Sequence, residues 1–201
     1  MKGPGPLVVT GLLAAALAAS VLLLPGTRSD LGPDTLADDG IGPLRLSADF
    51  SQAERLAFGL APDSAFSGLG CSGQDEIRYD TQLGDWPVAV MAMGSDDRIL
   101  EIEATLHTPT QAGSEQHCLE LRDRFAEVFS QRFGPLQDTW RIEKPVSREL
   151  LARTGPVVVM ARWFPTGRSC YVSAHFGMAK GPPGGEPTRL AGLSALDLTA
   201  E

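Results

Sequence analysis

The sequence has little basic charge relative to its acidic charge. Its 201 residues carry 17 Lys plus Arg against 25 Asp plus Glu, for a formal net charge of −8. Nucleic-acid binding depends on clustered Lys and Arg that displace counterions from phosphates, so this balance argues against a nucleic-acid partner. Hydrophobic residues make up 43% of the chain, which is too high for a disordered protein and indicates a folded domain.

Sequence motifs for common active sites are also scarce. The chain contains no CxxC pair, no GxSxG nucleophile elbow and no glycine-rich loop before a helix. The nearest candidates are Cys71 and Ser72 in the stretch GCSG, which we interpret as loop residues. We therefore predict no catalytic residue, no metal site and no cofactor. A small periplasmic hydrolase that uses Cys71 or Ser72 with a histidine remains the alternative.

Histidines and paired carboxylates lie on polar strand faces. Glu101 and Glu103 alternate with apolar residues, and His107 continues the same face. We interpret this face as solvated and as protecting a sheet edge. His175 falls on the polar side of a second alternating strand, and His117 opens a helix.

The amino terminus is typical of an export signal. Lys2 precedes an uncharged apolar run over residues 7–24, followed by Pro25 and Gly26. Such a run rises about 27 Å as a helix, which is within the range for spanning a membrane. Residues 1–26 are thus a cleaved signal peptide or, in our preferred interpretation, an uncleaved anchor in the inner membrane. The following domain is expected outside the cytoplasm, in the periplasm or exported.

The chain has three cysteines, which predict one disulfide and one odd thiol in an oxidising compartment. Cys118 shares a helical face with Leu121, and Cys170 alternates with Val172 along a strand. Both would point into the same core, so Cys118 and Cys170 are the favoured pair. Cys71 remains open as the partner of either one.

The chain beyond the leader predicts a single domain over residues 40–180. A linker rich in Gly, Pro and Asp precedes it at residues 27–39, and a flexible tail follows at 181–201. Ser51 and Glu54 have the spacing of a capping box, which predicts a short helix that begins there and stops near Gly59 and Pro62.

Hairpins and one long helix fill the rest of the domain. A long helix is expected over residues 113–135, capped by Ser114 and ended by Gly134. Residues 147–153 are expected to form a capped turn or short helix. Asp96 and Asp97 lie in a hairpin turn, where Asp is favoured. The strands are expected at residues 43–46, 76–80, 86–93, 99–107, 139–143, 155–164 and 169–177.

This order of elements predicts an α+β fold. Adjacent strands are joined by tight turns, so the sheet is antiparallel and βαβ units are excluded. We expect two layers, with the short N-terminal helix and the long helix packed on one face of a sheet of hairpins.

Two stretches resemble a known group of proteins. GIGPLRL at residues 40–46, followed by a capped helix, and the hairpin VMAMGSDDRILEIEA at residues 90–104 resemble small exported proteobacterial domains of unknown function. Those domains are similar in fold to small outer-membrane-assembly lipoproteins and β-lactamase-inhibitor-like modules. The resemblance covers residues 40 to about 106, implies a binding module rather than an enzyme, and supplies no catalytic residue.

Together these features predict a non-enzymatic envelope protein that acts as an interaction module. Its expected partner is another envelope protein, with an inhibitor or immunity-like role as a special case. The inner membrane is a second partner through residues 7–24 if the leader is uncleaved. A protein that encloses a hydrophobic ligand is the remaining alternative. The sequence identifies neither the partner nor the oligomeric state.

Overall fold

The computed structural model describes residues 32–107 and 110–178. The predicted leader at residues 1–26 and the predicted tail at 181–201 lie outside the described residues. Within the described part, no helix has the length and apolar character needed to cross a membrane.

The described residues form an α+β fold with an antiparallel main sheet, as predicted. The helices are α1 (Phe50–Leu60) and α2 (Glu115–Phe133). The strands are β1 (Leu36–Ala37), β2 (Gly40–Ile41), β3 (Leu44–Arg45), β4 (Phe66–Leu69), β5 (Asp75–Leu83), β6 (Trp86–Ser95), β7 (Arg98–Leu106), β8 (Thr110–Gln111), β9 (Gln137–Glu143), β10 (Arg148–Thr154), β11 (Val157–Phe164) and β12 (Ser169–Phe176).

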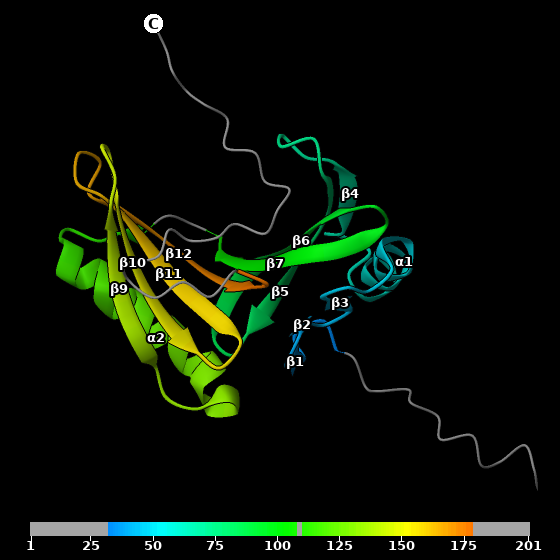
Figure 1. The fold of residues 1–201 in the computed structure, drawn as a ribbon, viewed down its shortest axis with the longest axis horizontal. Helices are drawn as coiled ribbons and strands as arrows, with labels where there is room; N and C mark the ends of the chain where they lie inside the picture. Colours follow the sequence, from blue (N-terminus) through cyan, green and yellow to red (C-terminus); the bar gives the residue numbers. More distant parts are fainter. Residues whose placement is uncertain (1–31, 108–109, 179–201) are drawn as a thin grey trace, which may run out of the picture. The chain divides into compact units, whose positions relative to one another are not determined.

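The main sheet has the strand order β4-β5-β6-β7-β12-β11-β10-β9, with β8 also paired to β12. β7 and β12 pair over only four residue pairs, from Thr105 opposite Ser173 to Ile102 opposite Phe176. Neighbouring strands of a sheet are rotated relative to one another, so strands far apart in this order run in different directions. Figure 1 accordingly shows β6 and β7 running across the direction of β10 and β11.

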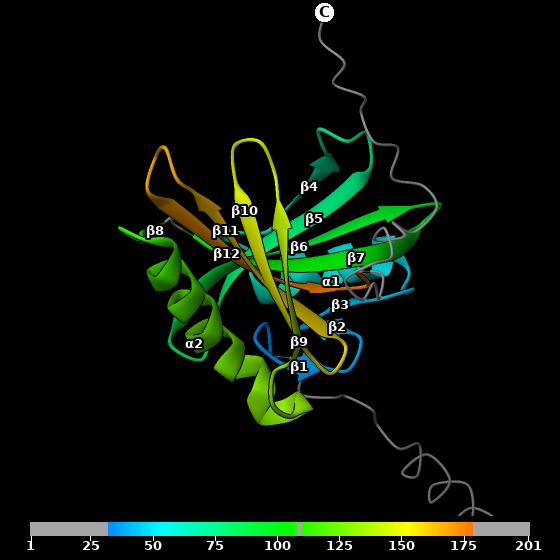
Figure 2. The same ribbon diagram turned by 60° about the vertical axis from the view of Figure 1, so that its left-hand side comes forward.

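Both helices contribute to one core. Ala53 and Ala57 of α1 and the apolar side of α2 belong to a single cluster of buried residues with the inner face of the sheet. Figures 1 and 2 show α2 along β10, β11 and β12, and α1 near the opposite half of the sheet. Edge-to-face aromatic contacts pack the core beneath α2. The ring pairs are Trp86–Phe125, Phe125–Phe129, Phe129–Phe176 and Phe133–Phe176.

The cap of α1 differs from the prediction. The carboxylate of Asp49 accepts a hydrogen bond from the Gln52 amide at 2.8 Å, so Asp49 is the N-cap and Ser51 lies inside the first turn. Glu54 accepts a hydrogen bond from the Ser67 hydroxyl of β4 instead of turning back to the helix start. The capping-box prediction was therefore wrong, because the cap lies two residues before Ser51, although α1 does end at Leu60, before Pro62.

α2 forms as the sequence predicts. The Ser114 hydroxyl accepts from the His117 amide at 3.2 Å, and Gly134, with φ of 91°, ends the helix. Cys118, Leu121 and Phe125 are all buried on its inner side.

The segment at residues 147–153 is a strand, not a turn or short helix. It forms most of β10 and pairs on one side with β9 and on the other with β11. Its Leu, Ala, Arg and Glu residues favour a helix by propensity, but backbone pairing on both sides outweighs a preference of a few tenths of a kcal/mol per residue.

The expected linker also belongs in part to the folded domain. Strand β1 lies within it and pairs with β2, and β2 pairs with β3 to form a separate three-stranded sheet. The buried Tyr79 hydroxyl of β5 ties this sheet down, since its oxygen lies 2.9 Å from the Pro33 carbonyl and 3.2 Å from the Ile41 carbonyl. Burial raises the pKa of this hydroxyl well above its ordinary value.

The hairpin of β6 and β7 anchors the start of α1. Asp96 and Asp97 occupy its turn with φ of 52° and 60°, the left-handed conformation that tight hairpins require. A bulge follows Met93 at Gly94, where a Cβ atom would lie 2.9 Å from the Phe50 ring and 2.4 Å from the Arg98 carbonyl oxygen. Glycine at this position therefore lets α1 approach the hairpin closely.

A disulfide joins Cys118 of α2 to Cys170 of β12, with their Cα atoms 5.5 Å apart. Both cysteines belong to the main cluster of buried residues, as the sequence predicts for this pair. Cys71 is exposed and is not part of this disulfide.

Candidate functional site

One face of the main sheet points away from the helices (Figures 1 and 2). We call it the open face, made by the side chains of β7, β12, β11, β10 and β9 that alternate with core residues. Register places its side chains in cross-strand rows. The rows are Glu103–His175–Val158–Arg153, Thr105–Ser173–Met160–Leu151–Trp140 and Tyr171–Arg162–Glu149–Ile142.

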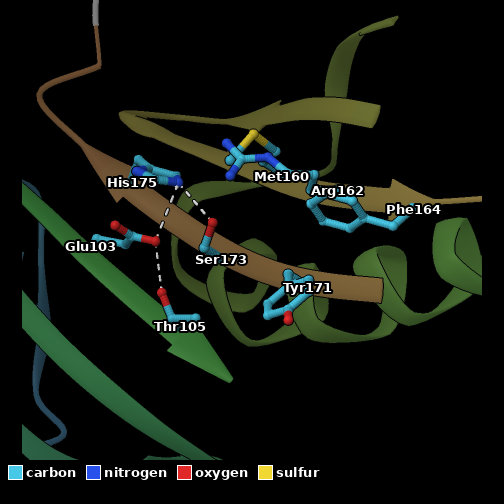
Figure 3. Close-up of a pocket in the computed structure, with 8 residues that line it drawn as sticks. All are labelled: Glu103, Thr105, Met160, Arg162, Phe164, Tyr171, Ser173 and His175. Carbon is cyan, nitrogen blue, oxygen red and sulfur yellow. Dashed lines mark hydrogen bonds and ion pairs between the residues drawn. The ribbon is translucent and has the colours of Figure 1, made fainter. Parts of the chain in front are cut away.

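The open face contains a pocket at the junction of the two halves of the sheet (Figure 3). Its volume is about 310 Å³, near the lower end of the range for ligand sites. Its lining comes from three neighbouring strands: Glu103 and Thr105 of β7, Tyr171, Ser173 and His175 of β12, and Met160, Arg162 and Phe164 of β11.

His175 is the centre of a hydrogen-bonded network in this pocket. Its Nδ1 lies 3.1 Å from a carboxylate oxygen of Glu101, and its Nε2 lies 2.7 Å from the Ser173 hydroxyl oxygen. A carboxylate only accepts hydrogen bonds, so Nδ1 carries a proton, and in the neutral ring Nε2 accepts from Ser173. Only 6% of the His175 side chain is exposed, so these contacts satisfy a nearly buried ring.

Glu103 is the second carboxylate in the pocket. It accepts a hydrogen bond from the Thr105 hydroxyl at 2.7 Å. The basic nitrogen nearest to it among the described residues is Nε2 of His175, at 3.9 Å, which is too long for a hydrogen bond. With 22% of its side chain exposed, Glu103 presents a charge that is partly desolvated and only weakly balanced.

A separate ion cluster lies at the other end of the pocket. Glu149, 7% exposed, accepts from Nε and Nη2 of Arg162 at 3.1 and 2.9 Å, and its Oε1 also lies 2.7 Å from Nζ of Lys144. This burial and double pairing hold the Arg162 guanidinium on Glu149.

Apolar and aromatic side chains complete the open face. Phe164 and Tyr171 pack edge to face with ring centres 5.5 Å apart, and 45% of Tyr171 is exposed. Leu151, Val158 and Met160 form a second buried apolar cluster beside the pocket, with Trp140, Ile142 and Met178 packed against it.

The structure corrects the interpretation of Glu101 and Glu103. β7 is not an edge strand, because it pairs with β6 on one side and β12 on the other. The two carboxylates therefore do not protect an edge, and both approach His175. The sequence shows their alternation with apolar residues. It does not show that His175, 74 residues after Glu101, lies on the neighbouring strand.

The sequence-predicted nucleophile candidates lie outside this pocket. The Ser72 hydroxyl bonds to the Gln74 side chain, and Cys71 is exposed in the turn between β4 and β5. Each of the three histidines has other partners: His107 pairs with Asp80, His117 with Glu120, and His175 with the network above. The structure thus brings no histidine into hydrogen-bond contact with Cys71 or Ser72 among the described residues.

No protein-family model and no curated protein matches the sequence. Among solved structures, a cysteine-rich secretory protein from Staphylococcus aureus is similar at 11% identity, with a TM-score of 0.28. That match covers 72% of this chain and spans 46% of the staphylococcal protein.

Proposed function

We propose that this chain is a non-enzymatic protein of the bacterial envelope that binds another envelope protein through its open face. The observation that carries the proposal is the open face itself. It combines an exposed aromatic residue, a buried apolar cluster and partly desolvated charges on a rigid antiparallel sheet. Aromatic anchors surrounded by ordered polar groups are typical of protein interfaces.

Two further features support this assignment. The apolar run at residues 7–24 indicates export, and a disulfide such as Cys118–Cys170 is stable in an oxidising compartment. The resemblance of the sequence to small exported binding modules agrees with an interaction role. We propose that the leader anchors the protein in the inner membrane.

Site-specific photocrosslinking in cells that produce the protein tests the proposal. A benzophenone amino acid replaces Tyr171 on the open face or, as the matched control, Glu120 on the exposed side of α2. We expect a discrete crosslinked envelope protein from position 171 and none from position 120. Equal crosslinking from both positions, or none from position 171, would contradict the assignment.

One observation favours a second candidate function, a serine hydrolase that uses Ser173. The order Ser173–His175–Glu101 has the connectivity of a nucleophile, a general base and an orienting carboxylate. Acyl transfer also needs donors that stabilise an oxyanion. Ser173 is paired with Thr105 on one side and Met160 on the other, so its backbone amide belongs to the sheet.

Two polar side chains that line the pocket are already engaged. The Arg162 guanidinium is engaged by Glu149, and the Thr105 hydroxyl donates to Glu103. Moreover, the Glu103 carboxylate near His175 would repel a developing negative charge. We therefore prefer the binding function. A fluorophosphonate probe separates the two, because covalent labelling of wild-type protein that is lost in Ser173→Ala would establish the hydrolase.

A further inference from the structure

We propose that the pocket of the open face receives a lysine or arginine side chain of the partner, with Glu103 as the residue that pairs with its charge. This inference rests on the proposed binding function and specifies the chemistry of the contact. The cavity, its charge balance and its aromatic wall each support it.

The charge balance at the Glu103 end of the pocket favours a cation. Glu101 and Glu103 both face His175, so even a fully protonated imidazole leaves one negative charge in excess. Glu101 is held at Nδ1 of the ring, whereas within residues 32–107 and 110–178 Glu103 has only the neutral Thr105 hydroxyl at hydrogen-bond distance. A partly buried carboxylate without a cation is unfavourable, and an incoming ammonium or guanidinium group would relieve this cost.

Arg162 does not already fill this role. Arg162 lies four residues along β11 from Val158, which belongs to the row of Glu103 and His175. The backbone positions of the two rows are therefore about 13 Å apart along the strand. Its guanidinium is bound to the nearly buried Glu149. The negative end of the pocket at Glu103 is therefore free to accept a cation from outside the described chain.

The walls suit the long apolar stem of a basic side chain. Met160 and Tyr171 flank Ser173 on the lining, and Phe164 packs against Tyr171 (Figure 3). Lysine and arginine bury their methylene groups on such surfaces while the charged head stays at the polar end. The net charge of −8 also favours encounter with a basic partner surface.

Binding of short peptides to the full-length, disulfide-bonded protein tests the inference. The probes are N-acetyl-Gly-Arg-Gly-amide, its lysine counterpart and a citrulline counterpart, which keeps the shape of arginine without its charge. NMR titration follows the backbone amides of Thr105 and Ser173. We expect the arginine and lysine peptides to shift these signals and the citrulline peptide to bind about tenfold more weakly, equivalent to about 1.4 kcal/mol.

Matched variants identify the residues responsible. Glu103→Gln keeps an acceptor oxygen for Thr105 and should lower the affinity for the arginine peptide about tenfold, while Glu120→Gln on α2 should leave it unchanged. Tyr171→Leu should lower it less than Glu103→Gln does, because it changes only the apolar contact with the stem. Unchanged denaturation midpoints would show that the variants are folded.

Equal binding of the citrulline peptide, absence of shifts at Thr105 and Ser173, or an unchanged affinity in Glu103→Gln would overturn the inference. The crosslinking experiment distinguishes this failure from that of the proposed function. If a partner still crosslinks to position 171 in Glu103→Gln but peptide binding does not depend on charge, the binding function is supported and the cation site is contradicted. If peptide binding depends on charge but no partner crosslinks, the proposed function is contradicted and the cation site is supported.

Discussion

A carboxylate oxygen of Glu101 on β7 lies 3.1 Å from Nδ1 of His175 on β12. Among the described residues, these two strands pair over four residue pairs next to this contact. This contact joins the two halves of the sheet beside the pocket. It connects residues that are 74 positions apart in the sequence.

Removal of this contact should destabilise the fold. In Glu101→Ala, the nearly buried Nδ1–H group of His175 loses its acceptor, so we expect the free energy of unfolding to fall by about 1–3 kcal/mol. Urea denaturation followed by circular dichroism measures the change. Glu120→Ala, at an exposed position on α2, is the control and should change stability by less than about 0.5 kcal/mol. A similar loss in both variants would show that the contact has no special role.

The disulfide should stabilise the packing of α2 on the sheet. It closes a loop with a sequence separation of 52 residues, and removing such a crosslink typically lowers the free energy of unfolding by about 2–4 kcal/mol. We expect this loss in the double variant Cys118→Ala/Cys170→Ala, and a smaller effect in Cys71→Ser because Cys71 is exposed. Native protein should react with one equivalent of a maleimide, at Cys71. Reaction of all three thiols in protein recovered from the envelope would contradict the disulfide.

Gly94→Ala should weaken the contact between α1 and the β6–β7 hairpin. The added methyl group would meet the Arg98 carbonyl oxygen at 2.4 Å, so backbone must shift, and we expect a loss of about 1–3 kcal/mol. Thermal unfolding measures it. Gly59→Ala is the control: that glycine lies inside α1 with open space around it, and alanine there should stabilise the helix slightly. Equal stability of Gly94→Ala and wild type would contradict the close approach.

Tyr79 should make stability sensitive to alkaline pH. Because burial raises the pKa of its hydroxyl in the folded state, the folded protein binds this proton more tightly than the unfolded chain does. Its contribution is therefore fully present below about pH 10, the ordinary pKa of tyrosine, and is lost as pH rises further. Denaturation at pH 8 to 11 should show a decline in wild type that is smaller in Tyr79→Phe. An identical pH dependence in both would contradict the assignment.

Elements with a clear local pattern were predicted correctly. The alternation in the stretch from Glu101 to Leu106 and the helical spacing of Cys118, Leu121 and Phe125 are periodic signals that depend only on which face is buried. The expected core position of Leu100 was wrong: Leu100 is exposed and Ile99 is buried, next to the bulge at Gly94. Asp96 and Asp97 indicated the hairpin turn because Asp tolerates the left-handed conformation found there.

Elements without such a pattern were predicted less well. The SRELLAR stretch at residues 147–153 has good helix formers, yet neighbours on both sides make it strand β10. Ser51 and Glu54 match a capping box, but Asp49 two residues earlier supplies the cap. In both cases a local preference competes with an alternative of similar free energy, and the surrounding structure decides between them.

The sequence by itself determined the fold class, the long helix and the hairpins, because the periodic burial of apolar side chains is a local property. Only the tertiary structure decided that β12 returns beside β7 and brings Ser173 and His175 against Glu101 and Glu103. Each of these residues alone has the pattern of a solvated strand face. The pocket exists because pairing between strands distant in the chain is selected by the packing of the whole core, which no local spacing encodes.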